Sequence, residues 1–308
     1  MGRSSKKDGG ISDHPSLWPD GVLPQQLQKL PEKNFQSLRF PLWTQNKARL
    51  IQEYLRLFEF ITHHGTYIDG FAAPQESAHE DMWAAKLVLE IEPKWFREFW
   101  LCDIDQPGIE RLKKLKTKHE AAKRRIEVLE GDFNETVSDI LNAGTIGEKT
   151  ATFALLDQRT FECEWRTVIA LSRHKKATKI ELFYFFPTGW IDRSLGAVRV
   201  DATIAKVRRW WGRDDWKSLL GMDGIARALM VAKRFESELG YGKATVYPIH
   251  SELRRGRVMY HMIHATDHPE ASPLMIRAYR KVSGRTELDS KQQTDFKDLW
   301  LRIDSDAD

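Results

Sequence analysis

The sequence lacks the features that would place it in several specialised classes of protein. Its 308 residues include only two cysteines, Cys102 and Cys163, which excludes a disulfide framework and a four-cysteine zinc site. No run of about 18 apolar residues occurs, so we expect no transmembrane helix. The basic N-terminus is not followed by the apolar stretch of a secretory signal. We therefore expect a cytoplasmic protein with no membrane partner.

An excess of charge of one sign is also missing. Lys and Arg total 48 against 44 Asp and Glu, and a net charge of +4 is too small to indicate a nucleic-acid partner by itself. The 41% of hydrophobic and 30% of charged residues are ordinary for a globular chain, so disorder of the whole chain is excluded. The sequence is long enough for one large domain or two small ones.

From about residue 44 onward, short apolar runs alternate with amphipathic segments. The runs predict strands over residues 65–71, 97–103, 126–132, 150–157 and 179–187, with helices between them. Strands that are apolar throughout are typical of a parallel sheet covered on both faces. Residues 244–249 and 257–266 predict a closing antiparallel pair, followed by a short helix. The sequence therefore predicts an α/β fold with a mostly parallel central sheet and helices on both faces.

Composition divides the chain into five segments. We expect an N-terminal tail and entry segment, a core α/β half that binds a cofactor, a helical Trp/Arg-rich insertion, the closing strands and helix of the core, and a C-terminal tail. Their predicted bounds are 1–40, 41–189, 190–243, 244–285 and 286–308.

An aspartate lies at the carboxyl end of each of four successive predicted strands. Asp69, Asp103, Asp132 and Asp157 are 34, 29 and 25 residues apart, which leaves room for one strand–helix unit in each interval. Ligands of open α/β sheets bind outside the carboxyl ends of the strands. The four aspartates therefore mark one candidate site at that edge.

Each aspartate can have a distinct role there. Asp69 is followed by small residues that let the backbone approach a ligand, and Asp103 can accept both hydroxyls of a ribose. Asp132 can accept from an adenine amino group or cap the next helix, and the two roles are compatible. Asp157 can orient or take up a proton on an amine or hydroxyl acceptor, or else it belongs to a salt-bridge cluster with Arg159.

Residues 198–216 combine arginine with tryptophan. Arg208 and Arg209 can contact phosphates, and Trp210 and Trp211 can stack on bases. The alternative is a helix with a buried aromatic face and a solvated basic face. Because adjacent tryptophans cannot both enter a core from one helix face, we favour a nucleic-acid partner.

Taken together, these motifs make the chain resemble the three-Cys-motif partner protein family, which is similar to class I S-adenosylmethionine-dependent methyltransferases. Lys47, residues 67–72, Pro74, Trp165 and Thr167 match its pattern. The resemblance implies a Rossmann-like methyltransferase fold, an S-adenosylmethionine cofactor and a genetically linked Cys-motif protein as partner. It assigns the cofactor to Asp69, Gly70, Phe71, Ala72, Pro74, Asp103 and Asp132.

The chain departs from that family at two turns. Ala73 and Gln75 replace two glycines of the loop after the first strand, which would hold the backbone farther from a cofactor. Gln158 and Arg159 replace the Pro-Phe that follows the aspartate of the fourth strand. The Asp-Pro-Pro-Tyr turn of base-methylating enzymes is therefore absent.

Three functional hypotheses follow from these observations. The first is a methyltransferase acting on nucleic acid, with Asp157 as catalytic residue and with Arg159, Arg208, Arg209, Trp210 and Trp211 contacting the substrate. The second is a catalytically inactive binding subunit that works with a partner protein. The third is a metal-dependent nuclease-like protein using Asp157, Glu162 and Glu164. The spacing of His261 and His264 places them on opposite faces of a strand, and we predict no metal site.

Overall fold

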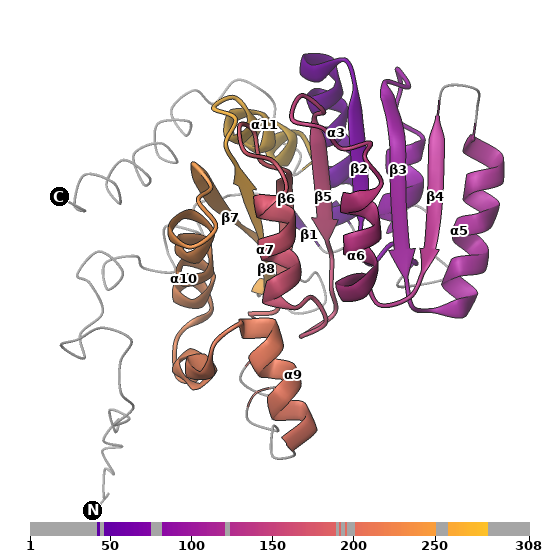
Figure 1. The fold of residues 1–308 in the computed structure, drawn as a ribbon. Coiled ribbons are helices and arrows are strands. Elements are labelled where there is room, and N and C mark those ends of the chain that lie inside the picture. The colour runs from indigo at the N-terminus through magenta and orange to yellow at the C-terminus, as the bar shows by residue number, and fades with distance from the viewer. Residues whose placement is uncertain are drawn as a thin grey trace, which may run out of the picture.

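All seven predicted strands form in the computed structural model, and they pair into one sheet with a short edge strand (Figure 1). Across the sheet the order is β1-β7-β8-β6-β5-β2-β3-β4, with β8 antiparallel to both of its neighbours and the other pairs parallel. Counted from β2, this is the strand order 3-2-1-4-5-7-6 of the methyltransferase-like Rossmann fold, so the predicted fold class is confirmed. The strands are β1 (Leu42–Trp43), β2 (Gly65–Asp69), β3 (Phe96–Asp103), β4 (Arg125–Glu130), β5 (Thr152–Leu156), β6 (Glu181–Phe186), β7 (Lys243–His250) and β8 (Val258–Thr266).

The structure describes residues 42–43, 46–74, 82–120, 124–188, 191, 195, 201–250 and 258–282. The predicted tails, 1–40 and 286–308, and Gln75 lie outside these residues. Within them, no helix combines the length and the apolar character needed to cross a membrane.

Helices cover both faces of the sheet because successive strand residues point to opposite sides. Tyr67 and Phe99 face one hydrophobic core, whereas Ile68 and Trp100 face the other. The first core is closed by α3 (Lys47–Thr62), α4 (Ala84–Leu89), α5 (Gln106–His119) and α11 (Ala271–Val282). The second is closed by α6 (Phe133–Asn142), α7 (Trp165–Arg173), α9 (Asp201–Trp211), α10 (Gly224–Ser237) and the 3-10 helix η3 (Asp214–Leu219).

Three helices that follow strands or turns begin at an aspartate that caps them. The carboxylate of Asp105 accepts from the amide of Gly108, and that of Asp132 accepts from the amide of Asn134. Asp223 caps α10 in the same way. A carboxylate at this position satisfies a free helix amide and interacts favourably with the helix dipole. The capping role predicted for Asp132 is therefore confirmed, and Asp105 has the same role at the start of α5.

The expectation that adjacent tryptophans cannot both be buried is wrong for α9. Trp210 is 1% exposed and stacks on Phe186 with 5.9 Å between ring centroids. Trp211 is 2% exposed, and its indole N–H donates to Asp215 at 2.6 Å. Both are buried because the sheet side covers one face of α9 while η3 and α10 cover a second. The two indoles are not exposed for stacking on a base.

Two parts of the predicted insertion lie in different places. Val231 and Phe235 of α10 pack with Ala244 of β7 and Ile263 of β8, so α10 belongs to the helical layer on the sheet. By contrast, α9 lies below the carboxyl ends of the parallel strands in Figure 1. Of the described residues in this segment, Lys206 and Arg209 of α9 line the cavity at the strand ends where ligands bind.

We expect Trp210→Ala to lower the free energy of unfolding by about 3–5 kcal/mol, because it leaves a large cavity in a packed core. Arg208→Ala, two residues away and 56% exposed at its side chain, is the matched control and should change stability by less than about 0.5 kcal/mol. Urea denaturation followed by circular dichroism measures both. Equal stability of the two variants would show that Trp210 is not a core residue.

Candidate functional site

A cavity of about 460 Å³ lies at the carboxyl ends of β2, β3, β4 and β5. This is the edge where the four aspartates were predicted to meet. Of the predicted site residues, Gly70, Phe71, Asp103, Asp132, Asp157, Arg159 and Arg209 line it, whereas Asp69, Ala72, Pro74, Arg208, Trp210 and Trp211 do not. Its volume is within the range of small-molecule sites.

Asp103, at the end of β3, is fixed by three backbone amides. Its Oδ2 accepts from Ala73 at 2.7 Å, and its Oδ1 accepts from Ile104 and Asp105 at 2.8 and 2.9 Å. Three amide donors hold the carboxylate in one orientation. Oδ2 keeps a lone pair that can accept a hydroxyl from a ligand in the cavity.

Asp69 shapes the loop rather than lining the cavity. It is 2% exposed, and its carboxylate accepts from the Tyr67 hydroxyl at 2.9 Å and the Phe71 amide at 3.2 Å. Burial raises the pKa of Asp69 to about 7, and the nearby charges of Asp157 and Asp103 add to this effect. The residue therefore holds the turn that leads Gly70 and Phe71 to the cavity wall.

Ala73, which replaces a glycine of the resembling family, is accommodated by a glycine on the neighbouring helix. A Cβ placed on Gly108, in the first turn of α5, would lie 2.3 Å from the Ala73 Cβ. The missing side chain at residue 108 lets the loop approach α5 and reach Asp103. The expectation that Ala73 holds the backbone away from the cavity is therefore not supported.

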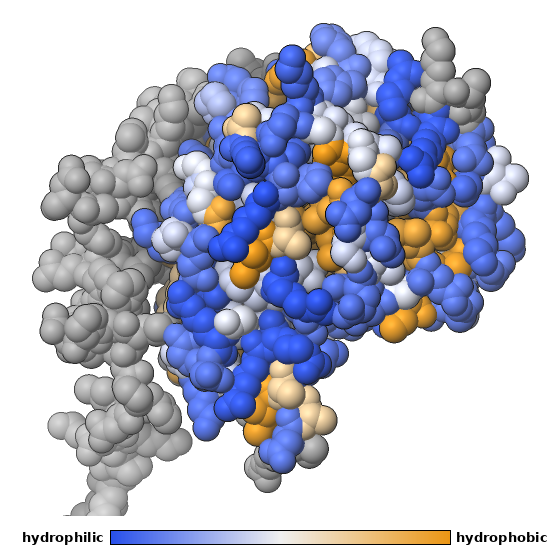
Figure 2. Space-filling model, in the orientation of Figure 1, coloured by the Kyte–Doolittle hydropathy of each residue, from blue (hydrophilic) through white to orange (hydrophobic). Residues whose placement is uncertain are grey.

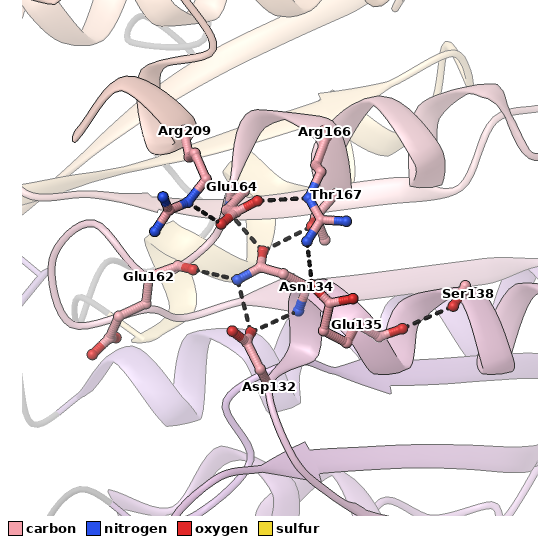
Figure 3. Close-up of polar contacts among 9 residues, drawn as sticks. All are labelled: Asp132, Asn134, Glu135, Ser138, Glu162, Glu164, Arg166, Thr167 and Arg209. Atoms are coloured by element: carbon pink, nitrogen blue, oxygen red, sulfur yellow. Dashed lines mark hydrogen bonds and ion pairs between the residues drawn. The ribbon is translucent and has the colours of Figure 1, made fainter. Parts of the chain in front are cut away.

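Asn134 joins the end of β4 to the loop before α7 (Figure 3). Its side-chain amide donates to Asp132 at 2.8 Å and to the carbonyl of Glu162 at 2.7 Å. Its side-chain oxygen accepts from the amide of Glu164 and the hydroxyl of Thr167. All polar atoms of this 6% exposed side chain are bonded, so it fixes one wall of the cavity.

Glu164 connects this wall to two exposed arginines. Its carboxylate accepts from Arg209 of α9 and Arg166 of α7, each at 2.6 Å, and Arg166 also pairs with Glu135 (Figure 3). A second, shallower cavity of about 450 Å³ lies on the other side of this pair. It is lined by Arg166, Arg208, Arg209 and Arg213 around Trp165 and Ile169. Figure 2 shows strongly hydrophilic side chains gathered over α7 and α9.

Asp157, at the end of β5, is paired with a lysine from the opposite layer of helices. The Lys47 ammonium, in the first turn of α3, lies 2.5 Å from Oδ2 of Asp157, and both side chains are about nine-tenths buried. Burial lowers the pKa of Lys47, but the Asp157 carboxylate and Tyr260 outweigh it and hold the pKa well above its ordinary value. Oδ1 of Asp157 is buried and has no hydrogen-bond partner among the described residues.

The residues after Asp157 make a different turn from the Pro-Phe of the resembling family. The Gln158 side chain is fully buried, donates to the carbonyl of Phe185 and accepts from the amides of Glu162 and Cys163. It thereby closes the loop from within. The predicted pairing of Asp157 with Arg159 is replaced by the pair with Lys47.

The carboxylates of the nuclease-like hypothesis have other partners. Asp157 pairs with Lys47, Glu162 accepts from the amide of Arg159, and Glu164 binds two arginines. Among the described residues, no three His, Cys, Asp or Glu side chains gather in a way that could hold a metal ion. These described residues therefore give no support to a metal-dependent nuclease.

Sequence reasoning missed several residues of the cavity. Ile104 is 73% exposed and lines it directly after Asp103, which is an unusual place for a large apolar side chain. The sequence could have indicated Ile104 as a lining residue, because it directly follows Asp103, the predicted ribose ligand. Asn134 and Lys206 also line the cavity. The pairing of Lys47 with Asp157, 110 residues apart, had no local signal.

We expect Gly108→Ala to lower the free energy of unfolding by about 1–3 kcal/mol, because the new methyl group overlaps that of Ala73. The double variant Ala73→Gly/Gly108→Ala removes the overlap with the Ala73 methyl group and should recover part of the loss, because the new Cβ still lies 2.9 Å from Oδ2 of Asp105. Urea denaturation of the two variants and of Ala73→Gly measures the coupling. Additive effects would show that the two residues do not share one space.

Comparison with known proteins identifies no family for this chain and finds a similarity to a solved structure. No family model matches the chain, and no curated protein matches it. The crystal structure of protein LPL1258 from Legionella pneumophila str. Philadelphia 1, a DUF519 family model, is similar with a TM-score of 0.41 and 12% identity, over 77% of this chain and 91% of that chain. We identify the methyltransferase-like Rossmann fold from the strand order of this chain. The cavity lies at the carboxyl edge of that sheet.

Proposed function

We propose that the protein is an S-adenosylmethionine-dependent methyltransferase that acts on nucleic acid. The observation that carries this proposal is the cavity at the carboxyl edge, which Asp103, Asp132 and Asp157 line from the ends of three strands of the sheet. In a sheet of this order, that edge is where a nucleoside ligand fits.

The chemistry of the cavity suits this cofactor. Six carboxylates and three basic side chains line it, which favours a ligand that carries a sulfonium and an ammonium group. The free lone pair of Asp103 is available to a ribose hydroxyl, and the exposed Ile104 side chain offers an apolar surface to a base. When bound, the cofactor supplies an electrophilic methyl group.

Asp157 and Lys47 are arranged to orient the acceptor. The ammonium of Lys47 keeps one oxygen of Asp157 occupied, so the other oxygen has a fixed direction. A carboxylate held in this way at the cavity wall can accept an N–H or O–H hydrogen bond and thereby direct the lone pair of the acceptor toward the methyl group. A buried charge pair costs free energy to desolvate, so its presence here is better explained by positioning than by stability.

Nucleic acid is the proposed substrate because the arginine-lined cavity adjoins the first one. Arg209 and Glu164 line both, so a bound strand would pass directly from one to the other. The arginines of this surface are about half exposed and paired with acids such as Glu164 and Asp214. The Arg208–Asp214 pair is exposed at both ends, and such pairs contribute only about 0–1 kcal/mol, so a phosphate can replace Asp214 at low cost.

Isothermal titration calorimetry tests cofactor binding. We expect S-adenosylmethionine and its demethylated product to bind, and Asp103→Asn to weaken S-adenosylmethionine binding by roughly tenfold or more, because a charged hydrogen-bond acceptor is lost. Asp139→Asn, exposed on α6, is the control and should bind normally. The absence of heat from either ligand would refute the proposal and favour a non-catalytic binding subunit.

Substrate binding can be tested separately with a 20-nucleotide single-stranded RNA and a DNA duplex as probes. The double variant Arg208→Ala/Arg209→Ala should weaken binding and reduce the slope of log affinity against log salt by about 1–2. Lys113→Ala/Lys114→Ala removes the same charge from exposed positions on α5 and should leave the slope unchanged. Identical salt slopes in the two double variants would contradict the assigned surface.

A further inference from the structure

A separate cavity of about 370 Å³ lies at the opposite, amino edge of the sheet. Thr152 and Glu181, where β5 and β6 begin, and Thr266, where β8 ends, line it together with residues of α3 and α11. The carboxyl-edge cavity takes its lining from the other end of β5 and from the residues after β2, β3 and β4. The two cavities share no residue, so the function proposed above leaves this one unused.

The wall of this cavity is mainly apolar on one side. Tyr54 and Phe58 of α3 are buried, whereas Ile61 is 45% exposed at the entrance. Leu274 of α11 is half-buried and lines the cavity from the facing helix. A hydrocarbon or aromatic group could bury itself between these two helices.

The other side carries three lysines, Lys149, Lys175 and Lys179. Lys175 is 3% exposed, and its ammonium donates to the carbonyl of Thr150 at 2.6 Å. Lys179 donates to the carbonyl of Ser172 at 3.1 Å. Among the described residues none of the three forms an ion pair, whereas the arginines at the other edge are paired with carboxylates.

The acids near these lysines are already engaged. Glu181 accepts from the Tyr54 hydroxyl, from His264 at 2.8 Å and from Thr266 at 3.0 Å. Asp267 accepts from the amides of Gly242 and Lys179. Glu148, outside the lining, accepts from the backbone amides of residues 176 and 177.

Burying an ammonium group without a carboxylate partner costs free energy of folding, and a bound anionic ligand would offset that free energy. Burial lowers the pKa of Lys175, and Glu148 offsets this only in part. Lys175 therefore contributes a partly compensated charge to a cavity whose opposite side is mainly apolar. This combination suits a ligand with one anionic group and an apolar body.

We propose that the amino-edge cavity binds a small amphipathic carboxylate, with its anionic group among the lysines and its apolar body between α3 and α11. The proposal does not depend on the function proposed for the carboxyl edge. Sodium octanoate is a suitable probe, and octanol has the same body without the charge.

Calorimetry on the full chain should show octanoate binding with a dissociation constant of roughly 1 mM or tighter, as expected for about ten heavy atoms, and octanol binding at least about tenfold more weakly. Lys175→Met/Lys179→Met should weaken octanoate binding by about tenfold or more while preserving side-chain length. Lys206→Met, which removes one charge from the other cavity, should bind octanoate normally.

Leu274→Trp, which fills the apolar side, gives a second test that keeps all three lysines and should also abolish octanoate binding. Thermal unfolding of each variant verifies that it is folded. The proposal is overturned if octanoate gives no heat, if octanol binds equally well, or if Leu274→Trp or the double lysine variant binds octanoate like the unchanged protein. Titration with S-adenosylmethionine is a separate measurement, so failure at one edge is distinguishable from failure at the other.

Discussion

The buried ion pair between Lys47 and Asp157 is the interaction on which the arrangement of the site depends. It connects the first turn of α3, on one face of the sheet, to the end of β5 at the carboxyl edge. A lysine in the first turn of a helix faces the positive end of the helix dipole, and its burial adds a desolvation cost. The Asp157 carboxylate, together with Tyr260, offsets the cost of burying Lys47, and the pair fixes the direction of the remaining oxygen of Asp157.

At the same edge, backbone amides donate hydrogen bonds to the carboxylates that follow the strands. Asp69, Asp103 and Asp132 each accept from amides of the loop or helix that follows a strand. Such bonds hold the acids in fixed positions, while Asn134 joins two of these loops. A site made this way is preorganised, which is what the proposed methyl transfer between two bound groups requires.

Charge distinguishes the two edges of the sheet. At the carboxyl edge, an acid-rich cavity adjoins arginines that are each held by a carboxylate, such as Arg209 by Glu164. At the amino edge, Lys175 and two further lysines line a cavity with one mainly apolar side, and in the part of the chain that the structure describes they form no ion pair. The first arrangement suits a cationic ligand beside a polyanion, and the second suits a small anion.

The sequence by itself determined the strands, the sheet edge and most of the acids that meet there. Seven predicted strands form, and the closing acids lie at one edge, because apolar periodicity and strand polarity are local properties of the chain. Only the tertiary structure decided that Trp210 and Trp211 are both buried, that Gly108 accommodates Ala73, and that Lys47 pairs with Asp157. Each of these depends on a contact between elements far apart in the chain, and no local spacing encodes such a contact.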